Sequence, residues 1–93
     1  MKIFISKNAR NNLYLYSFYK RKYSTRSAKE FFKDFNSKIQ SLSLFPYMYP
    51  KLLSNNSYRK ILFNKKYIIL YTIDNNNIYI DSVLYCGQDY LKL

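Results

Sequence analysis

The side chains of this sequence that could do chemistry are cations and tyrosines. The 93 residues include 16 lysines and arginines and 12 tyrosines, with one cysteine and no histidine. Without histidine, no Ser–His or Cys–His pair can form and no imidazole can bind a metal. We therefore expect no metal and no other cofactor. The single Cys86 cannot form an internal disulfide, which is typical of a protein of the reducing cytoplasm.

The cations are concentrated in the first two-thirds of the chain. The net charge is +11: residues 1–66 hold 15 lysines and arginines against Glu30 and Asp34, whereas residues 67–93 hold one base against three acids. Such a charge attracts polyanions, and their binding should weaken steeply with salt because counterions are released. RNA, the ribosome, DNA and an acidic protein all fit this field. AT-rich coding bias also favours lysine, but it does not explain so few acids.

The elements that position these side chains begin with a short strand and a helix. Residues 2–6 form an apolar run typical of a strand, and Ser6 can then cap a helix. Three consecutive cations suit the negative end of that helix dipole. The expected apolar positions are Ala9, Leu13, Tyr16 and Tyr19, followed by Lys20, Arg21 and Lys22.

A second helix is expected after a break at residues 23–26. Ser27 and Glu30 have the spacing of a capping box, in which each side chain accepts from the other residue's backbone amide. Apolar residues then recur in a 4-3-4-3 rhythm, and Phe45 ends the helix because it precedes a proline. The expected apolar stripe is Ala28, Phe32, Phe35, Ile39 and Leu42.

The remaining residues are expected to form a polar loop and three strands. The loop covers residues 51–57, and the strands cover 58–63, 67–73 and 78–85, which are rich in β-branched and aromatic residues. Asparagine-rich tight turns join the strands, because asparagine tolerates the left-handed region. In the middle strand, the residues that point to one face and those that point to the other are both apolar or aromatic. This pattern predicts a central strand.

This order of elements, β-α-α-β-β-β, predicts one α+β domain over residues 1–93. A two-helix hairpin should pack on one face of a mostly antiparallel four-stranded sheet, leaving the opposite, concave face free to bind. The apolar runs are too short for a membrane span, and the N-terminal run is too short for a signal peptide. We expect a soluble, cytoplasmic protein.

Several short motifs, taken in order, resemble one known family. Phe45-Pro46 and Pro50 follow the second helix, Arg59 and Lys60 open a strand, and residues 67–74 form the next strand. The remaining motif residues are Ala9, Leu13, Tyr16, Ala28, Phe32, Ile39, Leu42, Leu44, Tyr58, Ile61, Ile80, Val83, Leu84, Tyr85, Gln88, Asp89 and Tyr90. Over nearly the whole chain this resembles the RelE/ParE toxin superfamily.

The resemblance implies the toxin of a bacterial type II toxin–antitoxin system. In that family a co-expressed antitoxin wraps the toxin and covers its basic surface, so we expect an acidic antitoxin as partner. RelE-like members cleave mRNA on the ribosome, whereas ParE-like members poison DNA gyrase without being nucleases. Fold similarity does not separate these activities, so the site must decide between them.

Arg59 and Lys60 are the expected catalytic cations, because they begin the strand where the family usually carries a functional arginine. Their charges could stabilise the charge that builds on a scissile phosphate. Lys51, Lys65 and Lys66 could position neighbouring phosphates. The alternative is a solvated strand edge with ordinary surface lysines.

Tyr85 and Tyr90 are the expected aromatic site residues, able to stack on a base or to deliver a proton. With 12 tyrosines in the chain, the alternative for each is a place in the core. Many family members carry a basic residue just before the Gln-Asp-Tyr stretch, and this chain has none there. Gln88 could bind a phosphate there, but without charge assistance.

Three functions follow, in order of preference. The first is a ribosome-associated endoribonuclease, with Arg59 and Lys60 on the phosphate and Tyr90 on a base. The second is a non-enzymatic inhibitor of DNA gyrase, which fits the missing cation near Gly87. The third is a basic nucleic-acid-binding module or an inactive toxin.

Overall fold

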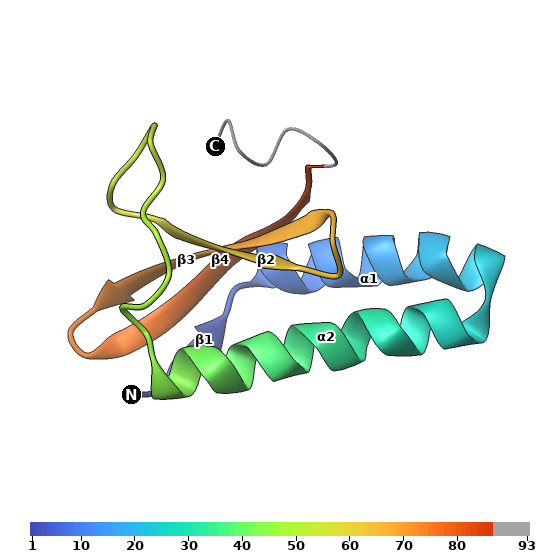
Figure 1. Ribbon diagram of the computed structural model, residues 1–93, viewed down its shortest axis with the longest axis horizontal. Helices are drawn as coiled ribbons and strands as arrows, with labels where there is room; N and C mark the ends of the chain where they lie inside the picture. Colours follow the sequence, from blue (N-terminus) through green and yellow to red (C-terminus); the bar gives the residue numbers. More distant parts are fainter. Residues whose placement is uncertain (87–93) are drawn as a thin grey trace.

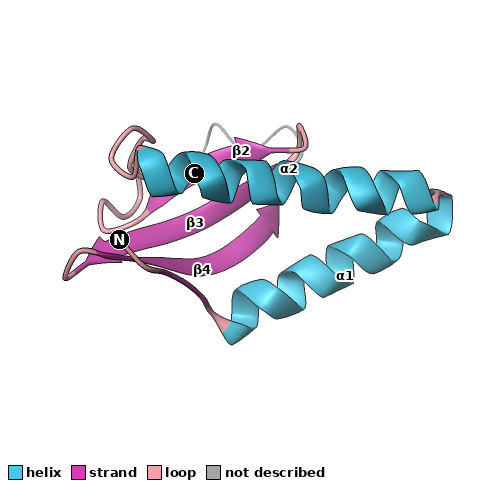
Figure 2. Ribbon diagram, turned by 90° about the horizontal axis from the view of Figure 1, so that it is seen from below, coloured by secondary structure: helices cyan, strands magenta, loops and turns pink. Residues whose placement is uncertain are grey.

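The computed structural model describes residues 1–86 and has the predicted order of elements (Figure 1). The strands run in the order β1-β4-β3-β2, with β1 parallel to β4 and the other pairs antiparallel. Both helices cover one face of this sheet (Figure 2), so the predicted α+β fold is confirmed. The elements are β1 (Ile3–Ile5), α1 (Lys7–Tyr23), α2 (Thr25–Leu44), β2 (Arg59–Phe63), β3 (Tyr67–Asp74) and β4 (Asn77–Tyr85).

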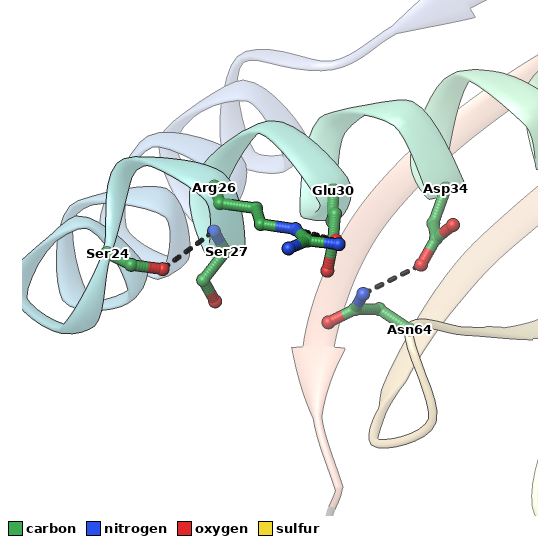
Figure 3. Close-up of polar contacts among 6 residues, drawn as sticks. All are labelled: Ser24, Arg26, Ser27, Glu30, Asp34 and Asn64. Carbon is green, nitrogen blue, oxygen red and sulfur yellow. Dashed lines mark hydrogen bonds and ion pairs between the residues drawn. The ribbon is translucent and has the colours of Figure 1, made fainter.

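A single residue, Ser24, joins the two helices. Its backbone amide donates to the Lys20 carbonyl at 3.1 Å and closes α1, and its hydroxyl accepts from the Ser27 amide at 3.0 Å and opens α2. The predicted break at residues 23–26 is therefore confirmed in place but is a single residue long, and the capping box at Ser27 is wrong, because Ser24 supplies an N-cap three residues earlier. Glu30 instead pairs with Arg26 at 3.1 Å (Figure 3).

The helices bury somewhat different side chains from those predicted. Phe31, absent from the predicted stripe, is fully buried, and its ring centroid lies 5.0 Å from that of Tyr67. Phe32 and Ile39 are only partly buried against the core. On α1, Tyr19 is exposed, because this helix packs along one narrow side. Ser6 caps α1 as predicted, accepting from the Ala9 amide at 2.9 Å.

Strand β3 is central and is buried over much of both faces, as predicted. A three-residue turn, 64–66, connects it to β2, and a two-residue turn, 75–76, connects it to β4. Asn64 and Lys65 have φ of 48° and 72°, and Asn75 and Asn76 have φ of 49° and 65°. Two successive left-handed residues match the right-handed twist of a hairpin.

A bulge in β4 sets which of its side chains face the helices. Leu70 pairs with Ser82 and Tyr71 with Ile80, so Asp81 has no partner in β3. Ile80 and Val83 therefore both reach the core between sheet and helices, although they are three residues apart. A bulge inserts one residue into a strand and so reverses the alternation beyond it.

Side chains of α1 and of its N-cap continue the hydrogen bonding of β4 where β1 ends. Strand β1 pairs only with residues 78–80 of β4. Beyond them, the Ser6 hydroxyl donates to the Asp81 carbonyl at 2.6 Å, the Val83 amide donates to Asn12 Oδ1 at 3.0 Å, and the Tyr85 amide donates to the Tyr16 hydroxyl at 3.1 Å. These bonds satisfy backbone groups that an exposed edge would leave open to another strand.

Candidate target-binding surface

Arg59 and Lys60, expected to act on one phosphate, lie on opposite faces of β2. Successive residues of a strand point to opposite sides. Arg59 is in register with Tyr71, whose side chain belongs to the core under the helices. Lys60 is in register with Leu70 and lies beside Leu62 and Ile68 on the other face. The structure does not bring these two cations together.

Arg59 is bound to the loop that follows α2. Its Nη1 donates to the Tyr49 carbonyl at 2.7 Å and to the Tyr47 carbonyl at 3.3 Å. Its guanidinium carbon also lies 5.4 Å from the centroid of the Tyr47 ring. Hydrogen bonds from a charged donor to carbonyls are stronger than neutral ones. This arginine therefore anchors residues 47–49 against the edge of the sheet.

Tyr71 holds the same loop from the core. Its hydroxyl donates to the Pro46 carbonyl at 2.7 Å. Burial raises the pKa of Tyr71 to about 12, although the nearby Arg59 charge opposes part of that rise. The phenol therefore stays protonated at neutral pH and keeps its hydrogen bond. A hollow lined by Tyr47, Lys51 and Arg59, here called the loop-end hollow, lies beside these contacts.

A second hollow, here called the hairpin-end hollow, lies where the β2–β3 turn meets the helix hairpin. Three predicted site residues, Lys65, Lys66 and Tyr85, line it together with Lys20 and Tyr67. The Lys20 ammonium lies 5.1 Å from the centroid of the Tyr67 ring, and the rings of Tyr67 and Tyr85 are 5.3 Å apart. This hollow thus combines cations with adjoining aromatic rings.

Tyr67 is a neutral member of this cluster. Burial raises its pKa above the ordinary value of a phenol, and the neighbouring hydroxyls of Tyr85 and Tyr16 raise it further. Tyr67 is buried, whereas Tyr85 is exposed at the mouth of the hollow. Tyr85 is therefore the ring that a bound molecule would meet.

Two carboxylates stand at the rim of the hairpin-end hollow. Asn64 donates through Nδ2 to Asp34 Oδ2 at 2.7 Å, and Glu30 accepts from Arg26 (Figure 3). The three lysines and two acids that line the hollow give a formal charge of 3 − 2 = +1. Aromatic rings among charges of both signs resemble a protein-binding surface more than a bare phosphate site, since interfaces are enriched in tyrosine.

Sequence reasoning missed Lys20, which was assigned only to the end of α1. The position of Lys20 relative to the packed residues of α1 could have identified it. Lys20 lies four residues after Tyr16 and three after the buried Ser17, so its stem runs along the packed side of the helix. Gln88 and Tyr90, the remaining predicted site residues, lie outside the described residues.

Metal and membrane sites can be considered over residues 1–86. There the carboxylates and Cys86 form no cluster of three or more that could hold a metal ion. None of the helices in that part of the chain is both long and apolar enough to cross a bilayer.

The chain is similar to a protein family defined by a model of its sequences. That model describes the ParE toxin of the type II toxin–antitoxin system parDE, and it matches residues 3–90. The match spans every element that forms the two hollows. No curated protein matches the sequence significantly.

Proposed function

The chain belongs to the ParE toxin family of type II toxin–antitoxin systems, within the RelE/ParE superfamily, and from this premise we propose that it arrests growth by binding DNA gyrase rather than by cleaving RNA. Membership makes it the toxin component of such a system and implies a cognate antitoxin as its partner. Gyrase is a cytoplasmic target, and we place the toxin there too.

The separation of Arg59 from Lys60 is the observation that carries this proposal. Cleavage of a phosphodiester needs charged groups that converge on one scissile phosphate, within about 3 Å of the atoms where charge develops. These two side chains diverge, and Arg59 already donates to two backbone carbonyls. Binding to a protein needs no such convergence.

We assign the contact with gyrase to the hairpin-end hollow. Lys65 and Lys66 are exposed on a tight turn, and Tyr85 presents a ring beside them. A short turn between paired strands holds its backbone in place, so little backbone freedom is lost when these side chains bind. Tyrosine in such a position supplies a large contact area together with a hydrogen-bonding hydroxyl.

A supercoiling assay with purified DNA gyrase tests this function. We expect the toxin to inhibit ATP-dependent supercoiling of a relaxed plasmid in proportion to its concentration. In parallel, primer extension on a translating mRNA should reveal no toxin-dependent cuts. Full supercoiling activity, with cuts in the translated mRNA, would contradict the proposal. Growth unaffected by expression of the toxin would instead favour an inactive toxin or a plain nucleic-acid-binding module.

Ribosome-associated mRNA cleavage is the second candidate. The neighbouring Tyr85, Lys65 and Lys66 favour it, because an exposed ring beside two cations can stack a base and hold the adjoining phosphates. In this version Arg59 and Lys60 stay candidate catalytic cations and Lys51 and Gln88 candidate phosphate ligands. Tyr90 would stack on a base. Loss of mRNA cuts in a Tyr85→Ala variant that still folds would support this candidate.

A further inference from the structure

Lys20 gives the hairpin-end hollow an ammonium group that no hydrogen bond of the fold uses. The residue is partly buried, whereas Lys65 and Lys66 in the same hollow are exposed. Its ammonium lies 5.1 Å from the centroid of the Tyr67 ring and 5.9 Å from that of Phe31. Across residues 1–86 it forms no hydrogen bond and no ion pair. A cation held over aromatic rings keeps N–H groups that can donate to a bound molecule.

The Ser27 hydroxyl is a second unused donor in this hollow. Ser24 caps α2 in its place, so the hydroxyl does not have the role that the sequence predicted for it. Ser27 is partly buried and lines the hollow from the first turn of α2. In the described part of the chain, nothing forms a hydrogen bond with its hydroxyl. Lys20 and Ser27 can therefore both donate to an acceptor that enters.

The acids of the hollow limit how much negative charge can enter. Glu30 and Asp34 lie three and seven residues after Ser27, on the same side of α2 (Figure 3). Glu30 pairs with Arg26, but Asp34 accepts from the neutral Asn64, which does not cancel its charge. A nucleic-acid strand carries phosphates in a row, and those beside Asp34 would be repelled. A single carboxylate next to Lys20 avoids this repulsion.

Aromatic rings form the rest of the surface that a bound molecule would touch. Tyr67 is buried, and its ring lies 5.0 Å from that of Phe31 and 5.3 Å from that of Tyr85. Tyr85 is exposed at the mouth of the hollow. An acidic side chain of a protein has an apolar stem that can pack on Tyr85 while its carboxylate reaches Lys20. A free inorganic anion would contact the donors alone.

We propose that Lys20 determines which partner the hairpin-end hollow accepts, by donating to one carboxylate of an acidic side chain that Ser27 also binds. Tyr85 packs on the stem of that side chain, and Lys65 and Lys66 contact the surface around it. Naming gyrase as the protein that supplies the carboxylate rests on the proposed function. The recognition of a carboxylate by the hollow does not.

Inhibition of gyrase supercoiling by toxin variants tests this role. Lys20→Met keeps an unbranched stem over the rings but removes the charge. We expect half-inhibition to need about 30-fold more of this variant, because the partner's carboxylate would be left without its ion pair. Lys20→Arg should lose no more than about fivefold, since a guanidinium also lies over aromatic rings and binds carboxylates. Ser27→Ala should lose about tenfold through one hydrogen bond to a charged group.

Lys22→Met is the matched control. Lys22 belongs to the same last turn of α1, and its ammonium lies 5.0 Å from the centroid of Phe18 and 5.7 Å from that of Tyr19, outside the hollow. Lys20→Met and Lys22→Met both lower the net charge from +11 to +10, since 11 − 1 = 10. The control should inhibit gyrase like the wild type. Circular dichroism and thermal unfolding check that every variant folds.

The salt dependence of inhibition separates lost recognition from a structural defect. Salt screens an ion pair between toxin and partner, so inhibition by the wild type and by Lys22→Met should weaken as salt rises. Inhibition by Lys20→Met should weaken less steeply, because that ion pair is already absent. Equal salt dependence of Lys20→Met and Lys22→Met would contradict the assigned contact.

A small carboxylate tests the hollow without gyrase. At constant ionic strength, N-acetylglutamic acid amide should shift the ring-proton NMR signals of Tyr67 and Tyr85 saturably, and N-acetylglutamine amide should not. Lys20→Met should abolish these shifts and Lys22→Met should keep them. Shifts of the same size with inorganic phosphate would assign the hollow to phosphate groups and overturn the proposal.

The supercoiling and NMR measurements distinguish a wrong target from a wrong contact. A wild-type toxin that leaves gyrase active but shows shifts that depend on Lys20 would refute the proposed function and support recognition of a carboxylate. Lys20→Met that inhibits gyrase as well as Lys22→Met does would overturn the role of Lys20 and leave gyrase as the target. A wild-type toxin without any carboxylate-dependent shift overturns the proposal as well.

Discussion

The two ends of the sheet use the same residue types for different purposes. At the loop end, Arg59 donates to two backbone carbonyls and Tyr71 to a third. At the hairpin end, Lys20 lies over the buried ring of Tyr67, and no carbonyl bond ties it to a loop in the described part of the chain. A cation bound to backbone carbonyls contributes stability. A cation resting on an aromatic ring still has donors to offer a partner.

Replacing Arg59 should give the largest loss of stability. Arg59→Ala removes two charge-assisted hydrogen bonds and is expected to lower the free energy of unfolding by about 2–3 kcal/mol. Urea denaturation measures this. Lys51→Ala, in the same hollow, should change stability by no more than about 0.5 kcal/mol. A stable Arg59→Ala variant that has lost toxicity would reverse the roles assigned to the two ends.

Removing one tyrosine hydroxyl at each end of the sheet compares how much the two ends contribute to stability. Tyr71→Phe leaves the Pro46 carbonyl without its donor in a partly buried place and should cost about 1–2 kcal/mol. Tyr16→Phe removes an exposed bond to the Tyr85 amide and should cost about 0.5 kcal/mol. Thermal unfolding of both variants gives the comparison, and equal losses would argue that the two ends are equally important for stability.

The pH dependence of stability should come partly from the loop end. The pKa of Tyr71 is raised to about 12, above the value of about 10 expected when the chain unfolds. Between these values the native state binds more protons than the unfolded state, so stability falls as pH rises. Urea unfolding from pH 9 to pH 11 should show a smaller fall for Tyr71→Phe than for the wild type. Parallel falls would contradict this assignment.

Lys65 should give the smallest effect, and in the stabilising direction. It adopts φ of 72°, a left-handed conformation that is unfavourable for a residue with a side chain. Lys65→Gly is expected to stabilise the protein by about 0.5 kcal/mol, with glycine's flexibility in the unfolded state offsetting part of the relief. A rise of a few degrees in Tm would confirm this, and a fall would indicate that the Lys65 side chain contributes to the fold.

The elements of this fold could be predicted because local signals and apolar patterns agree. The asparagine turns and the doubly apolar β3 indicate the hairpins and the central strand without further information. The exact position of the helix junction was harder to predict from the sequence, because Ser24 and Ser27 are both acceptable N-caps. The choice between them depends on packing of the whole hairpin.

The site could be predicted only in part, because it depends on contacts between distant residues. That Arg59 binds the carbonyls of Tyr47 and Tyr49 follows from the way the loop folds back, which no local pattern specifies. The bulge at Asp81 likewise decides the face of Val83. Lys65 and Lys66 were identifiable, since a tight turn between two strands must be exposed.

The most direct test of the division between the two ends compares two pairs of exposed lysines. Lys65→Ala/Lys66→Ala and Lys29→Ala/Lys33→Ala both lower the net charge from +11 to +9, since 11 − 2 = 9. We expect the first variant to need at least about tenfold more expression to arrest growth, because its hairpin end has lost the charged contacts. The second should arrest growth like the wild type, and both should unfold at nearly the wild-type temperature. Equal loss of toxicity in both variants, or full toxicity in the first, would contradict the account.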